Sequence, residues 1–158
     1  MSEAKPHKVK EIFVDGPIDP AFIAKSIAKH ATRMDIGAHE IFLGQVRADH
    51  VVGTDDHAPA TTVAAIEYTA YREMALERMT AIREEAFTKW PSMTCLHVHH
   101  SLGTIKAGEL CFMVFASAPH RLAAREAVAW VVDRVKAELP IFGREVLSDS
   151  THLWKTNL

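Results

Sequence analysis

Two strand patterns joined by a short glycine-containing segment constrain the fold of this chain more than any other feature. Apolar residues recur in the manner of strands over residues 94–102 and 109–116. The stretch Gly103–Glu109, with the sequence GTIKAGE, joins them and suits a turn between antiparallel neighbours. A direct connection of this kind argues against a purely parallel sheet, in which each pair of strands needs a crossover segment.

Helical and strand patterns alternate along the rest of the chain. Asp19 and Pro20 mark a helix start, because aspartate accepts bonds from the first backbone N–H groups and proline loses nothing at the first helical position. Longer helices are predicted over about residues 71–89 and 119–138. Further strands are predicted at residues 11–14, 38–46, 62–68, 144–147 and 152–155. This order predicts an α+β fold with a largely antiparallel sheet and three main helices.

Length and composition fit one domain. The chain has 158 residues, of which 48% are hydrophobic and 24% charged, the proportions of a soluble globular protein. We expect residues 1–9 to form a disordered polar leader and residues 10–158 to form a single domain, with its longest loop at residues 48–61. There is no signal-peptide pattern and no apolar run of the roughly 18 residues that span a bilayer. We therefore expect a cytoplasmic protein without membrane contact.

The balance of charges limits the classes of partner. Lys and Arg total 18 against 20 Asp and Glu, which gives a formal net charge of -2. This excludes a generally basic surface for nucleic acid. It leaves room for a small cationic pocket.

One helix carries candidate anion-binding groups at both ends. The segment Ser117–Arg121 lies where a strand gives way to this helix, and backbone N–H groups together with the helix dipole favour an anion there. His120 and Arg121 add side-chain donors. Lys136 lies near the other end, about 22 Å away at 1.5 Å per residue. One small ligand reaches both ends only if other segments complete the site.

Three more basic residues are candidates. Arg47 follows a strand in which Gly44 gives access to the backbone, and a guanidinium can grip phosphate with two N–H groups. Arg144 and Lys155 are further candidate cations. Each of these is equally compatible with an ordinary solvated surface position.

The ten histidines raise the question of a metal site. His97 and His99 are two positions apart and therefore lie on the same face of a strand, whereas His100 lies on the other face. A third ligand is needed, and no cysteine or carboxylate stands at a recognised ligand spacing. We predict no metal site and no cofactor, and a His97–His99 metal enzyme stays the less favoured alternative.

A set of short motifs runs through the chain in unbroken order from about residue 11 to residue 156. They are residues 44–47 (GQVR), 66–68 (IEY), Tyr71, Met74–Ala75, 100–103 (HSLG), 107–109 (AGE), 117–121 (SAPHR), Lys136, 140–145 (PIFGRE) and Trp154. Together they resemble the MoaE family, the large catalytic subunit of molybdopterin synthase.

The resemblance implies an α/β-hammerhead type of α+β fold and a sulfurtransferase. It implies a homodimer within a heterotetramer, in which each copy binds a small ubiquitin-like, MoaD-like sulfur carrier. The carrier's C-terminal Gly-Gly thiocarboxylate would deliver sulfur to cyclic pyranopterin monophosphate to form the dithiolene of molybdopterin. No nucleic acid or membrane partner is implied.

The resemblance also implies functional residues. Lys136 matches a lysine important for catalysis, and Arg144 is the second expected catalytic residue. The expected substrate-binding residues are Gln45, Val46, Arg47, His120, Arg121, Lys136, Gly143, Arg144 and Glu145.

One position departs from the family pattern. Many members carry a second lysine where this chain has Gly143, followed by Arg144. An arginine supplies positive charge but does not readily donate a proton. Either Arg144 takes an electrostatic role, or the second lysine is dispensable, or activity is reduced. A non-catalytic carrier-binding or dimerisation module therefore stays an alternative.

Overall fold

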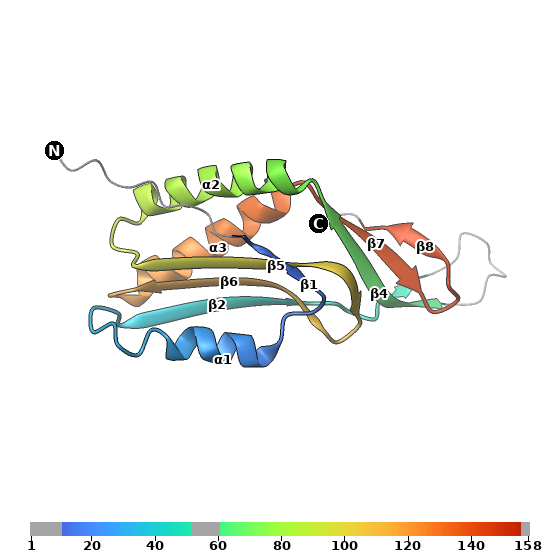
Figure 1. The fold of residues 1–158 in the computed structure, drawn as a ribbon, viewed down its shortest axis with the longest axis horizontal. Coiled ribbons are helices and arrows are strands. Elements are labelled where there is room, and N and C mark those ends of the chain that lie inside the picture. The colour runs from blue at the N-terminus through green and yellow to red at the C-terminus, as the bar shows by residue number, and fades with distance from the viewer. Residues whose placement is uncertain (1–10, 52–60, 156–158) are drawn as a thin grey trace.

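The computed structural model describes residues 11–51 and 61–155 (Figure 1). The elements in chain order are β1 (Phe13–Asp15), α1 (Pro20–Ala28), β2 (Ala38–Gln45), β3 (His50–Val51), β4 (Thr61–Ala70), α2 (Arg72–Lys89), β5 (Cys95–Lys106), β6 (Leu110–Ala118), α3 (Arg121–Glu138), β7 (Ile141–Leu147) and β8 (His152–Trp154). Within the described ranges, the predicted α+β class with three main helices and a largely antiparallel sheet is confirmed.

Strand β5 organises the sheet because it pairs with different partners along its length. Its first part, up to His100, pairs antiparallel with β6, and its last part, from Gly103, pairs antiparallel with β4. Gly103 has a φ of 87°, a left-handed conformation that glycine adopts without strain. The strand order is β2-β6-β5-β4-β7-β8, with β1 beside β5 and β3 beside β4. Strands β4, β7 and β8 consequently form a wing that projects past the helices (Figure 1).

Helices cover both faces of the main part of the sheet. α2 and α3 lie on one face and α1 lies on the other (Figure 1). Successive side chains of β6 alternate between them, because neighbours along a strand point to opposite faces. Val114 and Ala116 belong to the larger core, whereas Met113 and Phe115 form a smaller core with Ile18. The sheet therefore separates two hydrophobic cores, one on each of its faces.

Helix α1 is well capped but lightly packed. Asp19 accepts a hydrogen bond from the Ala21 N–H at 2.8 Å, and Pro20 occupies the first helical position, as the sequence predicts. None of the residues of α1 is fully buried, although Ile23 packs against the smaller core. Tertiary packing contributes most of the stability of a short helix, so α1 is the least securely held of the described helices.

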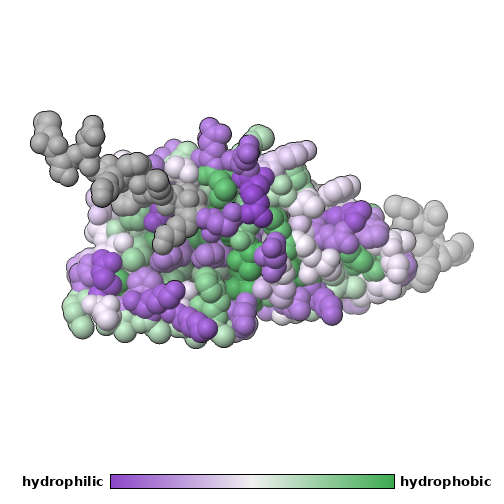
Figure 2. Space-filling view, in the orientation of Figure 1, coloured by the Kyte–Doolittle hydropathy of each residue, from purple (hydrophilic) through white to green (hydrophobic). Residues whose placement is uncertain are grey.

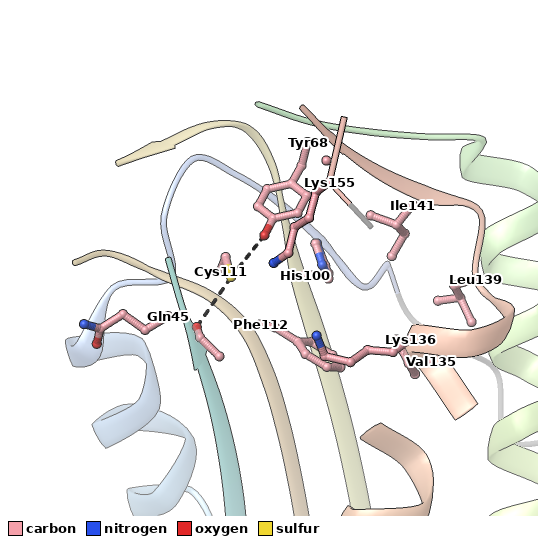
Figure 3. A pocket seen from close by; sticks show the side chains of 12 residues that line it. Gln45, Tyr68, His100, Cys111, Phe112, Val135, Lys136, Leu139, Ile141 and Lys155 are labelled. Atoms are coloured by element: carbon pink, nitrogen blue, oxygen red, sulfur yellow. Dashed lines mark hydrogen bonds between the residues drawn. The ribbon is translucent and has the colours of Figure 1, made fainter. Parts of the chain in front are cut away.

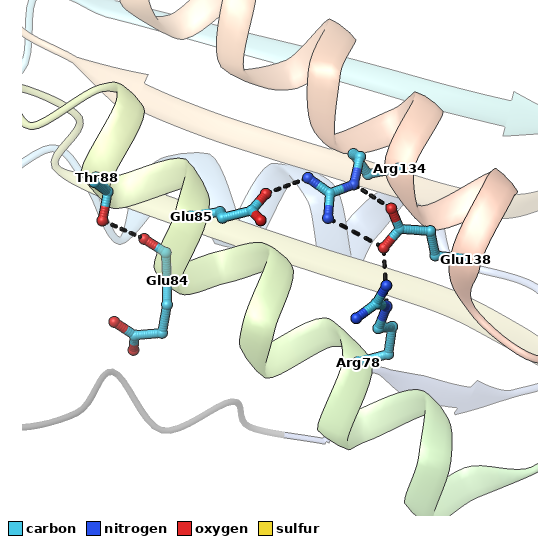
Figure 4. A network of polar contacts seen from close by, with 6 residues as sticks. All are labelled: Arg78, Glu84, Glu85, Thr88, Arg134 and Glu138. Atoms are coloured by element: carbon cyan, nitrogen blue, oxygen red, sulfur yellow. Dashed lines mark hydrogen bonds and ion pairs between the residues drawn. The ribbon is translucent and has the colours of Figure 1, made fainter.

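A charged network joins α2 to α3 (Figure 4). Arg134 of α3 contacts both Glu85 of α2 and Glu138 of its own helix. Arg78 of α2 pairs with Glu138 at 2.9 Å. Single pairs of exposed charges add little stability, but here two arginines share one carboxylate across the helix interface.

Several boundaries differ from the predictions, and three of them bear on the site. β5 continues to Lys106, so the turn before β6 is limited to residues 107–109 instead of 103–109, because Gly103 leads into the pairing with β4. β7 begins at Ile141, earlier than the predicted residue 144, because it pairs with β4 as far as Ala70. α3 begins at Arg121, later than the predicted residue 119.

The predicted loop at residues 48–61 contains strand residues at both of its ends. His50 and Val51 form β3, and Thr61 begins β4. Residues 52–60, like the predicted leader at residues 1–9, lie outside the described residues. Within residues 11–51 and 61–155, no helix is long and apolar enough to cross a membrane.

The surface combines hydrophilic helices with local apolar areas. In the orientation of Figure 1, hydrophobic residues show between α2 and α1, and hydrophilic residues surround them (Figure 2). Tyr71, Phe142 and Trp154 line a shallow apolar hollow beside the start of α2, and the rings of Tyr71 and Phe142 lie 5.6 Å apart.

We predict that Gly37→Ala destabilises the protein. The Gly37 N–H donates to the Ala118 carbonyl oxygen at 3.1 Å, and a Cβ at position 37 would overlap the Pro119 carbonyl oxygen. Relieving this overlap requires a backbone shift, which costs about 1–3 kcal/mol. Urea denaturation measures the loss.

Met34→Ala is the matched control, because Met34 is 89% exposed in the same connection and its truncation should change stability by less than about 0.5 kcal/mol. Equal stability of the two variants would contradict the tight approach at Gly37.

Candidate functional site

A pocket opens where the wing meets the end of α3 (Figure 3). Its empty volume, including the open mouth, is about 620 Å³. The lining residues are Gly44, Gln45, Tyr68, His100, Cys111, Phe112, Val135, Lys136, Leu139, Ile141, Gly143 and Lys155. They are spread over residues 44–155, so only the folded protein creates this pocket.

Two glycines keep the walls of the pocket close together. A Cβ at Gly143 would lie 3.1 Å from Cγ2 of Ile66 and 3.2 Å from Cε1 of Tyr68. A Cβ at Gly44 would lie 3.1 Å from Cβ of Phe112. Side chains at these positions would crowd the pocket, which explains why glycine fits at both.

Two amino groups enter the pocket from different elements (Figure 3). Lys136 extends from the last turn of α3, and Lys155 follows directly after β8. Burial lowers the pKa of Lys136, and the positive charges of Lys155 and Arg47 lower it further. A lysine with a lowered pKa still attracts an anion and exchanges its proton more readily near neutral pH.

A neutral imidazole lies beside these amines. His100 is buried, and its Nδ1 donates to the Ser101 carbonyl oxygen at 2.8 Å, which leaves Nε2 as an acceptor. Burial lowers the pKa of His100 to about 4, and the charges of Lys136 and Lys155 act in the same direction. At neutral pH the site therefore holds an uncharged imidazole that can accept a proton or a hydrogen bond.

A short hydrogen-bonded chain crosses the back of the pocket (Figure 3). The Tyr68 hydroxyl donates to the Cys111 sulfur at 3.6 Å, and the Cys111 thiol donates to the Gly44 carbonyl oxygen at 3.5 Å. Burial raises the pKa of Tyr68, so the phenol stays protonated. The chain links β4, β6 and β2 and holds the walls of the pocket together.

Several residues that the resemblance implied lie at this pocket. Gln45, Lys136 and Gly143 line it. Val46 is 2% exposed, and its backbone N–H and carbonyl bond to the turn between β5 and β6 instead of facing the cavity. Val46 therefore supports the wall without offering a side chain to a ligand.

Other implied residues lie close by without lining the pocket. The Arg47 side chain is 79% exposed and pairs with Asp49 at 3.1 Å. Arg144 pairs with Glu67 of β4 and faces away from the pocket, because neighbours along β7 alternate. Glu145 acts on the pocket through its charge, which adds to the raised pKa of Tyr68. The guanidinium of Arg144 is thus already engaged by a carboxylate.

His120 and Arg121 lie at the far end of α3. Arg121 is its first residue and Lys136 lies in its last turn, about 22 Å away. The wing lies beside the C-terminal end of α3, which carries Lys136, and not beside its start (Figure 1). Within the described residues, one chain does not bring Arg121 and Lys136 into one pocket.

Some pocket residues could not be assigned from sequence. Lys155 was only one of several candidate cations, and its position depends on a backbone bond from its N–H to the Gly143 carbonyl oxygen at 2.8 Å. Tyr68 belongs to the IEY motif and Cys111 to a predicted strand, but no pattern in the sequence assigns either of them to a pocket. The available signal was alternation, which places His100 on the opposite face from His97.

Comparison with known proteins identifies the family. The family model described as "MoaE protein" matches residues 14–138. The chain belongs to the MoaE family. Catalytic subunits of molybdopterin synthase from Drosophila mojavensis and Aedes aegypti are 35% and 34% identical over 123 residues, or 77% of this chain. The match covers 31% of the Drosophila mojavensis protein and 74% of the Aedes protein. The chain thus spans about a third of the length of the first curated relatives, which are Drosophila proteins.

A solved structure shares the fold of this MoaE chain. The X-ray structure of molybdopterin synthase from Staphylococcus aureus matches with a TM-score of 0.75 and 25% identity, over 94% of this chain and 98% of that chain. The hammerhead type of α+β fold implied by the resemblance is therefore confirmed.

We predict that acid weakens the fold through His100. The unfolded imidazole takes up a proton near its ordinary pKa of 6.5, whereas the folded one does so only near a pKa of about 4. The unfolded state binds more protons between these values, so stability is full above pH 6.5 and falls as the pH drops toward 4. The loss attributable to His100 is about 3 kcal/mol.

Urea denaturation between pH 7 and about pH 4.5 measures this loss in the natural protein and in His100→Gln. Other histidines titrate in both proteins, so the difference between them isolates His100. A difference that does not change with pH would contradict the assignment.

Proposed function

We propose that this protein is the sulfur-transferring subunit of a molybdopterin synthase. The observation that carries the proposal is the meeting of two amines, Lys136 and Lys155, beside the neutral His100 in one pocket of a MoaE fold. A phosphorylated pterin is an anion and needs cations of this kind. Membership of the MoaE family and the names of the curated relatives support the same activity.

The proposed reaction moves sulfur from a carrier protein to a pterin. The donor is the C-terminal Gly-Gly thiocarboxylate of a small ubiquitin-like, MoaD-like carrier, and the acceptor is cyclic pyranopterin monophosphate. The thiocarboxylate sulfur bonds to an oxygen-bearing carbon of the acceptor, and the carbon–oxygen bond at that carbon breaks, so that the oxygen leaves as water or stays on the phosphate. Water then attacks the carrier's carbonyl carbon, and the carbon–sulfur bond breaks, which leaves sulfur on the pterin and a carboxylate on the carrier. Two such transfers form the dithiolene.

Lys136 has the central role in this proposal. Attack on the carrier's carbonyl group creates an oxyanion, and a fixed cation stabilises that charge in the transition state. The lowered pKa of Lys136 also suits it to give or accept a proton. His100, which is neutral at pH 7, is a second acceptor for a proton within the pocket.

Lys155 takes the place of the second lysine that many family members carry at the position of Gly143. Its backbone bonds directly to Gly143, and its Cβ lies 3.6 Å from where a Cβ at Gly143 would stand. The neighbouring strand thus delivers an amine to nearly the same place. This arrangement favours an active enzyme over a non-catalytic binding module, and it makes an electrostatic substitution by Arg144 unnecessary.

A second copy of the chain completes the site. His120 and Arg121 are exposed at the start of α3, where the helix dipole favours a phosphate group. They lie too far from Lys136 in their own chain, so a homodimer has to bring them to the partner's pocket. Two carriers bound to such a dimer give a heterotetramer, which we place in the cytoplasm.

We predict that Lys136→Gln lowers single-turnover conversion of the precursor by at least about 100-fold, the usual effect of removing one oxyanion-stabilising group. Lys155→Gln should lower it by a comparable factor. The assay supplies thiocarboxylated carrier and follows molybdopterin, and circular dichroism checks the fold of each variant.

Lys106→Gln is the matched control, because Lys106 is exposed at the end of β5 and outside the pocket lining. A normal rate in Lys136→Gln would refute the proposed function. A normal rate in Lys155→Gln alone would refute only the role of Lys155.

We also predict that two inactive variants complement each other. If the site is shared between copies, Arg121→Ala and Lys136→Gln each inactivate both sites of their own homodimer. Random mixing after denaturation and refolding gives mixed dimers with one intact site, and about a quarter of the natural activity returns. Conversion that stays at the level of the separate variants would contradict a shared site.

A further inference from the structure

Three metal-binding side chains meet on the face of the sheet opposite the pocket. His30, Cys95 and His97 each offer one ligand atom, and these atoms all lie within 4.8 Å of one another. The two β5 residues are two positions apart and so point to the same face. The pair considered from the sequence does not form, because His99 packs against the ring of Phe22 at 4.9 Å and is not in the group.

The fold brings these side chains together from two elements. His30 lies just beyond the end of α1, and its ring centroid is 5.4 Å from that of His97. Both rings also contact Phe115 of the smaller core, with centroid distances of 5.2 Å and 5.8 Å. The group thus sits at the end of the interface between α1 and the sheet, apart from the pocket with Lys136.

Hydrogen bonding leaves His30 with a nitrogen suited to a metal ion. Its Nδ1 lies 2.6 Å from the Ser26 carbonyl oxygen. A carbonyl oxygen only accepts, so Nδ1 carries the proton and Nε2 keeps its lone pair. Metal-binding histidines commonly donate their second nitrogen in this way, which fixes both the tautomer and the ring orientation.

Two arginines lie close to Cys95, whose sulfur binds metals as a thiolate. Arg33 and Arg83 both interact electrostatically with the Cys95 sulfur. Arg33 is paired with Asp35 at 2.9 Å, so its charge is partly offset. A thiolate and an acidic neighbour therefore balance part of the repulsion that the arginines exert on a cation.

We propose that His30, Cys95 and His97 bind one zinc ion. Two imidazoles and one thiolate form a borderline-soft donor set that Zn²⁺ prefers over Mg²⁺ or Ca²⁺. Zinc–nitrogen bonds of about 2.0–2.1 Å and a zinc–sulfur bond of about 2.3 Å require the ligands to draw together by about 1 Å. Water completes the tetrahedron, because His39, the next histidine, is held by the Ser117 hydroxyl at 2.7 Å.

The bound ion fastens α1 to the sheet. This helix has no fully buried residue, and its packing rests on the small core around Phe115. A zinc ion held by one ligand beyond the helix and two on β5 crosslinks these elements at the end opposite the Asp19 cap. Zinc in this position stabilises the folded state, because the unfolded chain does not assemble the ligands.

Zinc and cobalt titrations of the untagged, reduced, chelator-treated full chain test the proposal. We expect one equivalent of Zn²⁺ to bind in competition with a chromophoric chelator and to raise the unfolding temperature. Co²⁺ should give the visible bands of a tetrahedral site together with a thiolate-to-cobalt charge-transfer band. Cys95→Ser should lose that band, and both Cys95→Ser and His97→Gln should weaken zinc binding by more than about tenfold.

His99→Gln is the matched control, because His99 lies on the same strand and face but outside the group. It should bind zinc as the natural protein does. The proposal is overturned if zinc does not bind, or if Cys95→Ser and His97→Gln bind it as tightly as the natural protein. Circular dichroism checks each fold, and His30→Gln replaces any β5 variant that does not fold.

Discussion

The change of partner along β5 is the constraint on which the rest of the molecule depends. Up to His100 the strand belongs to the sheet beneath the helices, and from Gly103 it belongs to the wing. β7 begins just after α3 and runs outward along β4. β8 runs back antiparallel to β7, so Lys155, directly after β8, reaches the pocket beside the last turn of α3.

The pocket brings together positively charged groups that repel one another. Lys136 and Lys155 repel one another, and burial penalises the charged forms of Lys136 and His100. Such repulsion lowers the stability of the empty site. A bound anion reverses the balance, because it compensates both amines at once. The chain has a formal net charge of -2, so this local excess of positive charge reflects placement and not composition.

Local patterns in the sequence were enough to predict much of the fold. Asp19 and Pro20 predicted the start of α1, and the alternation of apolar residues predicted the central strands. The end of β5 and the start of β7 were misplaced because both depend on pairing with β4, which is a tertiary contact. For the same reason Gln45, Lys136 and Gly143 were tied to the site only through family resemblance.

The sequence alone does not show which residues that are far apart along the chain lie close together in the fold. Lys155 enters the pocket because a backbone bond to Gly143 fixes its register, and no short-range pattern encodes that bond. His30 and Cys95 are 65 positions apart in sequence, so no ligand spacing connects them, yet α1 and β5 place them together. Conversely, the sequence makes Arg144 a candidate for binding an anion, but in the fold its guanidinium pairs with Glu67.

Strand β8 has a consequence for how the protein would lose the proposed activity on heating. It is three residues long, exposed throughout, and paired only with β7 among the described strands. Elements with so little buried surface open at a small fraction of the free energy needed for global unfolding. Fraying of β8 would withdraw Lys155 and unroof the pocket while both cores stayed intact. Thermal inactivation and thermal unfolding would then be separate events, with the first governed by a hairpin and the second by the sheet.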